Sequence, residues 1–126
     1  DGIVALAKAC LAAGIPVGLG TDTGCPFITH YDMWRELCYF VKFCGVTPAF
    51  ALHSATLLNA RLAGIDHLTG SVEKGKVADL IVCEKNPLED LTALRKLDMV
   101  IKDGWRIDHP AVKKLPQVER ELDKFL

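Results

Sequence analysis

The N-terminal stretch restricts the fold more than any other part of the chain. Residues 3–13 place apolar side chains three and four apart, which predicts a helix with one buried face. Gly14 stands where a helix C-terminal glycine belongs. Residues 15–19 are then apolar without alternation, as in a strand buried on both faces of a parallel sheet. Helix, short turn and buried strand form half of a repeating unit, so the sequence predicts the α/β class.

Further helices are predicted in the first half of the chain. Residues 31–44 show helical spacing and end at Gly45, and Asp32 is interpreted as the acid that caps the N-terminus of this helix. Thr47 and Pro48 open the next helix, because a threonine hydroxyl caps free amides and proline fits the first helical position. The side chains expected to face inward from residues 31–44 are Trp34, Leu37, Cys38, Val41 and Cys44.

The second half changes character, because glycines punctuate runs of β-branched residues. Residues 77–83 and 99–102 predict strands, and Asp103-Gly104 is a hairpin signal. The chain therefore divides near residue 65 into an α/β part and a part built mostly from short strands.

Two helices are also predicted in this second half. Residues 88–97 favour a short helix, and residues 116–126 favour an amphipathic one. Residues 119–124 are interpreted as the solvated face of the last helix. Its inner side chains are expected to be Val118, Leu122 and either Phe125 or Leu126.

The composition is that of a soluble globular protein. Hydrophobic residues make up 50% of the 126 residues, charged residues 25%, and the net charge is -1. Nothing in this balance indicates a nucleic-acid partner or a membrane surface. The sequence shows neither a membrane-spanning run nor a signal-peptide pattern. The five cysteines form no CxxC pair, so we expect reduced, packed thiols in a cytoplasmic protein.

Asp22 is the sharpest candidate for a functional group, because it follows the predicted buried strand in the loop GTDTG. In parallel α/β folds, ligand and catalytic groups lie at the carboxyl ends of strands. A carboxylate there can bind a metal or accept a proton, and Thr23 offers a hydroxyl to a substrate. The alternative is a helix cap or an Asx turn, which aspartate commonly provides.

The histidines are weaker candidates. His30 lies in the loop before a predicted helix, where it can bind a metal, contact substrate or form a local hydrogen bond. His53 falls near an apolar stripe and is interpreted as a core histidine with a satisfied hydrogen bond. His67 and His109 lie in polar connections and are expected to be solvated. One acid and one imidazole do not complete a metal site, because catalytic zinc uses three protein ligands.

Four stretches, taken in order, resemble the C-terminal portion of the amidohydrolase superfamily, in its imidazolonepropionase-like and Xaa-Pro dipeptidase-like branch. They are VGLGTDTG, TPAFALHSATLLNARLAGI, GSVEKGKVADLIVCEKNPLEDL and VIKDGW. The resemblance runs from residue 3 to about residue 107. Gly70, Gly75, Lys76 and residues 78–82 stand where the family pattern puts them.

This resemblance implies a fold, which is a metal-bearing (β/α)8 barrel joined to a small β-sandwich. Residues 1–65 would form the C-terminal part of the barrel, with residues 17–20 as its eighth strand. Residues 66–109 would form the C-terminal strands of the sandwich, and residues 110–126 a C-terminal helix.

The resemblance also implies an activity, which is metal-dependent hydrolysis of a C–N bond in an amide, a dipeptide or a cyclic amide. Asp22 would bind a divalent metal, expected to be zinc, and would move a proton between the attacking water and the leaving group. Thr23 and His30 would contact the substrate.

The family's other metal ligands are absent from this sequence: an HxH pair, a carboxylated lysine and two later histidines. The chain begins Asp1-Gly2, within a predicted helix, and we expect those ligands upstream of it. We therefore expect the C-terminal portion of a hydrolase that is inactive and metal-free alone and that associates with the missing part or with itself. The alternative is a complete, non-catalytic assembly module derived from the same fold.

Overall fold

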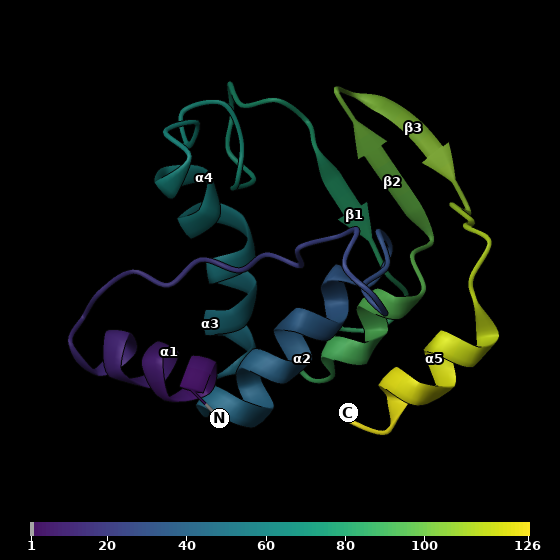
Figure 1. The fold of residues 1–126 in the computed structure, drawn as a ribbon. Helices are drawn as coiled ribbons and strands as arrows, with labels where there is room; N and C mark the ends of the chain where they lie inside the picture. The colour runs from purple at the N-terminus through teal and green to yellow at the C-terminus, as the bar shows by residue number, and fades with distance from the viewer. Residues whose placement is uncertain (1) are drawn as a thin grey trace.

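Helices and a small sheet occupy different parts of the molecule, as Figure 1 shows for the computed structural model, which describes residues 2–126. The helical segments are α1 (Gly2–Ala12), α2 (Met33–Cys44), α3 (Pro48–His53), the π-helix η1 (Ser54–Leu58), α4 (Asn59–Leu62), the 3-10 helix η2 (Leu91–Arg95) and α5 (Pro116–Asp123). The strands are β1 (Leu80–Val82), β2 (Met99–Lys102) and β3 (Trp105–Asp108). The α/β class predicted from the sequence is therefore confirmed.

Helix α1 forms where the spacing predicts it, but its apolar face is not buried. Ile3 is 87% exposed and Leu6 is 66% exposed, and no α1 side chain is buried. The predicted buried face is wrong as stated, because Ile3 and Leu6 are uncovered within residues 2–126. Ala7, Cys10 and Leu11 on the same face are partly buried, and Leu11 packs against the core.

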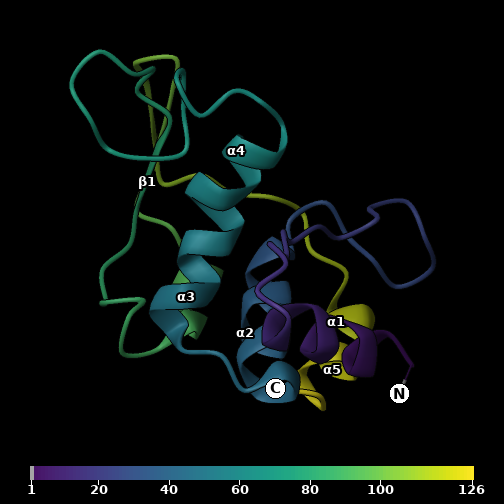
Figure 2. The ribbon, with the colours of Figure 1, turned by 90° about the vertical axis from the view of Figure 1, so that its left-hand side faces the viewer.

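The predicted strand at residues 15–19 is wrong as secondary structure. The segment runs extended past the helices, but no strand within residues 2–126 pairs with it. A strand is defined by its ladder of backbone hydrogen bonds, so an apolar extended segment without a neighbour does not become one. Figure 2 shows this segment leaving α1 and rising beside α2.

The core is built where α2 packs against α3 and η2. Its buried members are Leu37, Phe40, Ala51 and Leu91. Of the side chains predicted to face inward, Trp34 and Leu37 are buried, whereas Cys38, Val41 and Cys44 are only partly buried. Arg35 is also buried, which the apolar pattern does not indicate.

The ends of α2 and α3 test the predicted caps. Asp32 stands at the N-cap position of α2, but its side chain makes no capping hydrogen bond, so that role is a wrong prediction. Its carboxylate instead accepts hydrogen bonds from Thr29 and Trp34 and forms an ion pair with Arg35. Thr47 caps α3 as predicted, because its Oγ1 accepts the Phe50 amide at 3.1 Å.

His53 is exposed, so the prediction of a core histidine is wrong. Ala51 and Ser54 are the fully buried residues on this part of the helix, and His53 lies between them on the outer side. His67 and His109 are exposed, as expected.

The sheet is an antiparallel meander in the order β1-β2-β3. Asp103 and Gly104 join β2 to β3 with φ of 52° and 80°, the left-handed pair that a two-residue hairpin turn of type I′ requires. Strand β1 is shorter than the predicted 77–83. The Val77 amide bonds back to the Leu68 carbonyl at 2.8 Å, and pairing begins at Leu80 opposite Ile101.

The two late helices are both shorter than predicted. The segment predicted at 88–97 is the 3-10 helix η2, capped by Asp90, whose carboxylate accepts the Thr92 amide at 2.9 Å. Helix α5 begins at Pro116, as the pattern predicts, but Glu119 on it is only 7% exposed. The interpretation of residues 119–124 as a solvated face is therefore wrong for Glu119 and Asp123, whose carboxylates pair with arginines, whereas Arg120, Glu121 and Lys124 are exposed as expected.

None of the five cysteines forms a disulfide; four are partly buried and Cys25 is exposed. Within residues 2–126, no helix is long and apolar enough to cross a membrane.

We expect the native protein to lose stability when Asn59 is replaced by alanine. Its side chain makes both backbone hydrogen bonds of Leu19, and the substitution leaves that partly buried amide and carbonyl unpaired. An unsatisfied buried group costs about 1–3 kcal/mol. The urea midpoint should fall accordingly, whereas Asn86→Ala, which removes an exposed turn asparagine, should lower it less. Equal effects of the two variants would contradict this role of Asn59.

We also expect an acid-dependent loss of stability that depends on Asp123. Burial opposes ionisation of Asp123, but hydrogen bonds from Arg35 and Arg95 outweigh it and hold the pKa of this carboxyl below its usual range. A lowered folded-state pKa stabilises the protein above the unfolded value of about 4, and this contribution is lost as the pH falls through the folded value. Thermal melts between pH 7 and pH 3 should therefore drop less steeply for Asp123→Asn than for the wild type.

The matched control is Glu121→Gln on the same helix, since the carboxylate of Glu121 pairs with the exposed Lys124 and, within residues 2–126, with no arginine. A wild-type pH slope in Asp123→Asn, or the same reduction in both variants, would refute the assignment.

Candidate functional site

The segment at residues 15–19, which precedes the GTDTG loop with Asp22, is held in place by the side chain of Asn59 and not by a neighbouring strand. The Asn59 side chain accepts the Leu19 amide at 3.0 Å and donates to the Leu19 carbonyl at 2.8 Å. The contact needs a glycine beside it. A Cβ on Gly18 would lie 2.4 Å from Asn59 Oδ1 and 2.9 Å from a Leu62 methyl, closer than atoms approach. The Gly-Leu-Gly spacing thus allows Asn59 to fix the chain three residues before Asp22.

Asp22 itself is exposed and takes a left-handed backbone, with φ of 50°. Asp and Asn are the non-glycine residues that adopt this conformation most readily. Its carbonyl accepts the Cys25 amide at 3.2 Å and closes a turn. Within residues 2–126 its carboxylate makes no hydrogen bond or ion pair, so the side chain neither caps a helix nor closes an Asx turn. This leaves the carboxylate available to a ligand.

Thr23 is exposed beside it, and its hydroxyl lies 2.7 Å from the hydroxyl of Thr21. One of the two hydroxyls donates to the other, and the acceptor keeps its own proton for another partner. The loop therefore offers a hydroxyl donor next to the carboxylate of Asp22.

Glu36 on α2 is a second carboxyl group near the loop, which the sequence analysis missed. It is half-buried, and burial, followed by the negative charge of Asp22, raises its pKa. Glu36 lines a cavity of about 190 Å³ together with Thr21 and Thr29. A charged residue in an amphipathic helix such as α2 is expected to face solvent, so the sequence gives no sign that Glu36 lies near the loop.

His30 lies eight residues after Asp22, in the connection that leads to α2, and is exposed. Its ring packs edge-on against Tyr31, with centroids 5.1 Å apart and planes at 80°. His30 and Tyr31 line a different cavity, of about 470 Å³, together with Lys114. Thus the loop carries Asp22 and His30, but no contact in residues 2–126 joins these two side chains.

A metal site is not complete within the part of the chain that the structure describes. Residues 2–126 contain no group of three or more His, Cys, Asp or Glu side chains that could hold a metal ion. The carboxylate of Asp22 suits a divalent metal as a single ligand, but neither His30 nor Glu36 completes a set around it.

The comparisons with known proteins agree with one another. The amidohydrolase family matches residues 1–106. The chain is 36% identical over 76 residues to imidazolonepropionase from Geobacillus kaustophilus, a match that covers 60% of this chain and 18% of that protein. It is 36% identical over 91 residues to ochratoxinase from Aspergillus niger, covering 71% of this chain and 18% of that protein.

Solved structures show the same likeness. A Bifidobacterium longum protein provisionally assigned as a prolidase superposes with a TM-score of 0.93 at 43% identity, covering 97% of this chain and 30% of that one. A Xaa-Pro dipeptidase with methionine bound in its active site superposes with a TM-score of 0.75 at 36% identity, covering 84% and 25%. The chain thus spans less than a third of each of these four proteins. On the match across residues 1–106, the chain belongs to the amidohydrolase family.

Proposed function

We propose that this chain is the C-terminal part of a metal-dependent amidohydrolase that hydrolyses an amide or peptide C–N bond, with a dipeptide as the substrate we favour. The observation that carries the proposal is the unpaired, exposed carboxylate of Asp22, held at the end of an extended apolar segment by Asn59. Family membership and the likeness to a prolidase-type structure over 97% of the chain support it.

The proposal includes a division of the chain. Residues 1–65 would complete a (β/α)8 barrel, with residues 17–20 as a strand once neighbouring strands are present. Residues 66–109 would belong to a β-sandwich, and residues 110–126 would add a helix. The sheet β1-β2-β3 and the helical first half support this division. The unpaired cysteines favour a reducing compartment such as the cytoplasm.

In this proposal Asp22 carries protons. Its carboxylate accepts a proton from the water that attacks the carbonyl carbon and gives it to the nitrogen of the leaving amine. The hydroxyl pair of Thr21 and Thr23 can donate a hydrogen bond to the substrate, and His30 can contact it from the other end of the loop.

A divalent metal, with zinc as our choice, would supply an activated water and polarise the scissile carbonyl. Asp22 would be one of its ligands. Residues 2–126 hold no complete set of metal ligands, so the others would come from outside them. A solved structure with a similar fold, an adenosine deaminase from Xanthomonas campestris, has bound zinc.

The alternative is an assembly module without catalysis. Many large apolar side chains are exposed, including Ile3 at 87%, Val72 at 84% and Trp105 at 79%, and a protein partner that covers them would support this alternative. The same side chains fit the first proposal, in which the rest of the enzyme covers them. The alternative predicts a specific homo-oligomer that holds no metal and hydrolyses nothing.

Asp22→Asn in the native protein should lower turnover of Xaa-Pro dipeptides by about 10²- to 10⁴-fold, the usual contribution of a general acid–base group. The amide keeps the size of the side chain but neither accepts the proton nor binds the metal well. Circular dichroism and the melting temperature should stay close to wild type, because the carboxylate makes no internal contact in residues 2–126. Steady-state kinetics on a panel of dipeptides and cyclic amides is the measurement.

Asp108→Asn is the control, since Asp108 is exposed on β3 and its carboxylate pairs with Arg106 on the same strand. Full activity in Asp22→Asn would remove Asp22 from the mechanism. Absence of hydrolysis by the wild type on every amide tested, together with a metal-free oligomer by light scattering, would favour the assembly module.

Metal removal gives an independent test. Prolonged dialysis of the native protein against a chelator should abolish turnover, and added Zn²⁺ should restore it. Elemental analysis should find less metal per chain in Asp22→Asn than in the wild type, because one ligand is lost. Turnover that survives complete removal of metal would refute the metal-dependent reaction.

A further inference from the structure

We propose that residues 114–123, which we call the C-terminal strap, position the loop at residues 27–32 and with it the imidazole of His30. The inference rests on the proposed function only in assigning His30 to substrate contact. The strap lies beyond the region that matches the family, which ends at residue 106.

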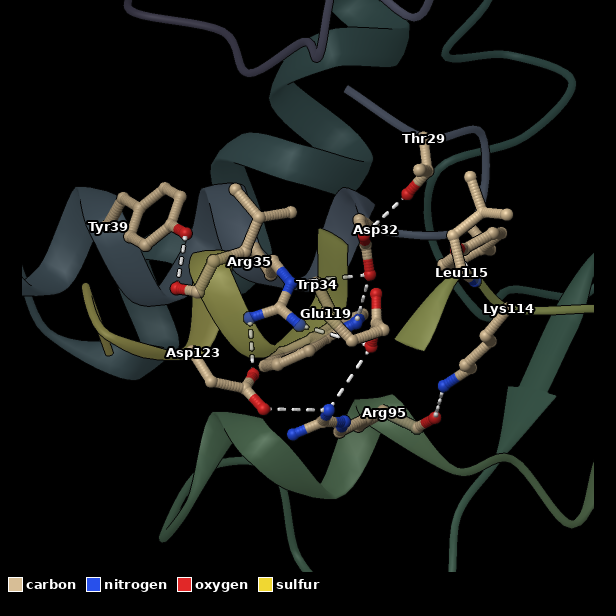
Figure 3. A network of polar contacts seen from close by, with 12 residues as sticks. Thr29, Asp32, Trp34, Arg35, Tyr39, Arg95, Lys114, Leu115, Glu119 and Asp123 are labelled. Carbon is tan, nitrogen blue, oxygen red and sulfur yellow. Dashed lines mark hydrogen bonds and ion pairs between the residues drawn. The ribbon is translucent and has the colours of Figure 1, made fainter. Parts of the chain in front are cut away.

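The first attachment is the buried guanidinium of Arg35, which is 2% exposed (Figure 3). Its Nη1 donates to Asp123 at 2.7 Å and its Nη2 to Glu119 at 3.1 Å, both on α5. Its Nε lies 3.3 Å from Asp32, the last residue of the loop. One cation therefore ties the strap to the loop.

The strap supplies two of the three carboxylates in the cluster around Arg35. Arg95 also donates to Glu119 at 3.1 Å and to Asp123 at 3.0 Å, and both guanidinium groups lie over the Trp34 ring. Without α5, Arg35 would keep only the carboxylate of Asp32 as an ion-pair partner. Breaking a buried ion pair by removing one partner is strongly destabilising, so these contacts favour the docked strap.

The second attachment reaches the residue next to His30. The Leu115 amide donates to the Tyr31 hydroxyl at 3.0 Å, and the Lys114 ammonium lies 5.8 Å from the centre of the Tyr31 ring. The His30 ring packs edge-on against that same tyrosine ring. The Thr29 hydroxyl bonds to Asp32 on the other side. His30 is therefore bracketed by residues that the strap and Arg35 hold in place.

Two substitutions in the native protein separate these attachments. Glu119→Gln removes the carboxylate shared by Arg35 and Arg95, and Tyr31→Phe removes only the hydroxyl bonded to Leu115. The matched control is Lys42→Met. It deletes contacts to the carbonyls of Phe125 and Leu126, at the end of the chain and away from the loop.

Hydrogen exchange measured by mass spectrometry reports the loop without relying on activity. We expect amides in residues 27–33 to exchange about tenfold faster in both variants. Tyr31→Phe loses the hydrogen bond from Leu115 to the loop, and Glu119→Gln loses the bonds that hold the strap to Arg35 and Arg95. Lys42→Met should leave this segment unchanged. Unchanged exchange in the first two variants, or an equal rise in all three, would overturn the inference.

Kinetics provide the second readout. Misplacing a group that binds substrate should raise KM by about tenfold in Glu119→Gln and Tyr31→Phe, with kcat near wild type because Asp22 is untouched. His30→Ala should show the same split with no change in loop exchange. A normal KM in both strap variants while His30→Ala is impaired would overturn the positioning role. Failure of the proposed function would appear separately, as full activity in Asp22→Asn.

Discussion

The position of the candidate loop depends on one side chain, because the Asn59 amide occupies both backbone hydrogen-bonding groups of Leu19. A carboxamide has the donor and acceptor of a peptide group, so it replaces one residue of a neighbouring strand. The single-turn π-helix η1 directly precedes Asn59, and its wider turn changes the phase of the residues that follow. Asp22 is thus placed by a helix residue and by the missing Cβ of Gly18.

A different kind of constraint, buried charge, organises the other side of the molecule. Three carboxylates, from Asp32, Glu119 and Asp123, surround the two guanidinium groups of Arg35 and Arg95. Burial alone would lower the pKa of Arg35, but its hydrogen bond to the carboxylate of Asp123 and the surrounding negative charges raise it. The charge therefore persists when buried, and α5 must stay docked to neutralise it. Apolar contacts define the core, whereas ion pairs fix the last helix to it.

Local features were predictable from the sequence, whereas partners in space were not. The Thr47 cap and the Asp103-Gly104 turn follow from short-range chemistry and are confirmed. The burial of Arg35 and Glu119 was missed because these two residues pair with each other across 84 positions of the chain. Asp22 stands out by its place after an apolar run, but Glu36 looks like an ordinary surface acid until α2 is packed beside the loop. The strand at 15–19 failed for the same reason, since pairing requires a neighbour that periodicity does not supply.

The failed predictions share a physical cause, which bears on the proposed barrel. Within residues 16–20, only Leu19 has backbone hydrogen bonds among the described residues, although the segment is apolar and extended. Helix α1, which leads into it, fully buries none of its side chains and leaves Ile3 and Leu6 exposed. In a parallel α/β fold, neighbouring strands and helices cover each helix-strand repeat. A repeat without those neighbours would have exposed apolar side chains on its helix and an unpaired apolar segment after it, as this chain does. The two failed predictions, a buried face on α1 and a strand at residues 15–19, therefore support the proposal that further strands and helices pack against this part of the chain.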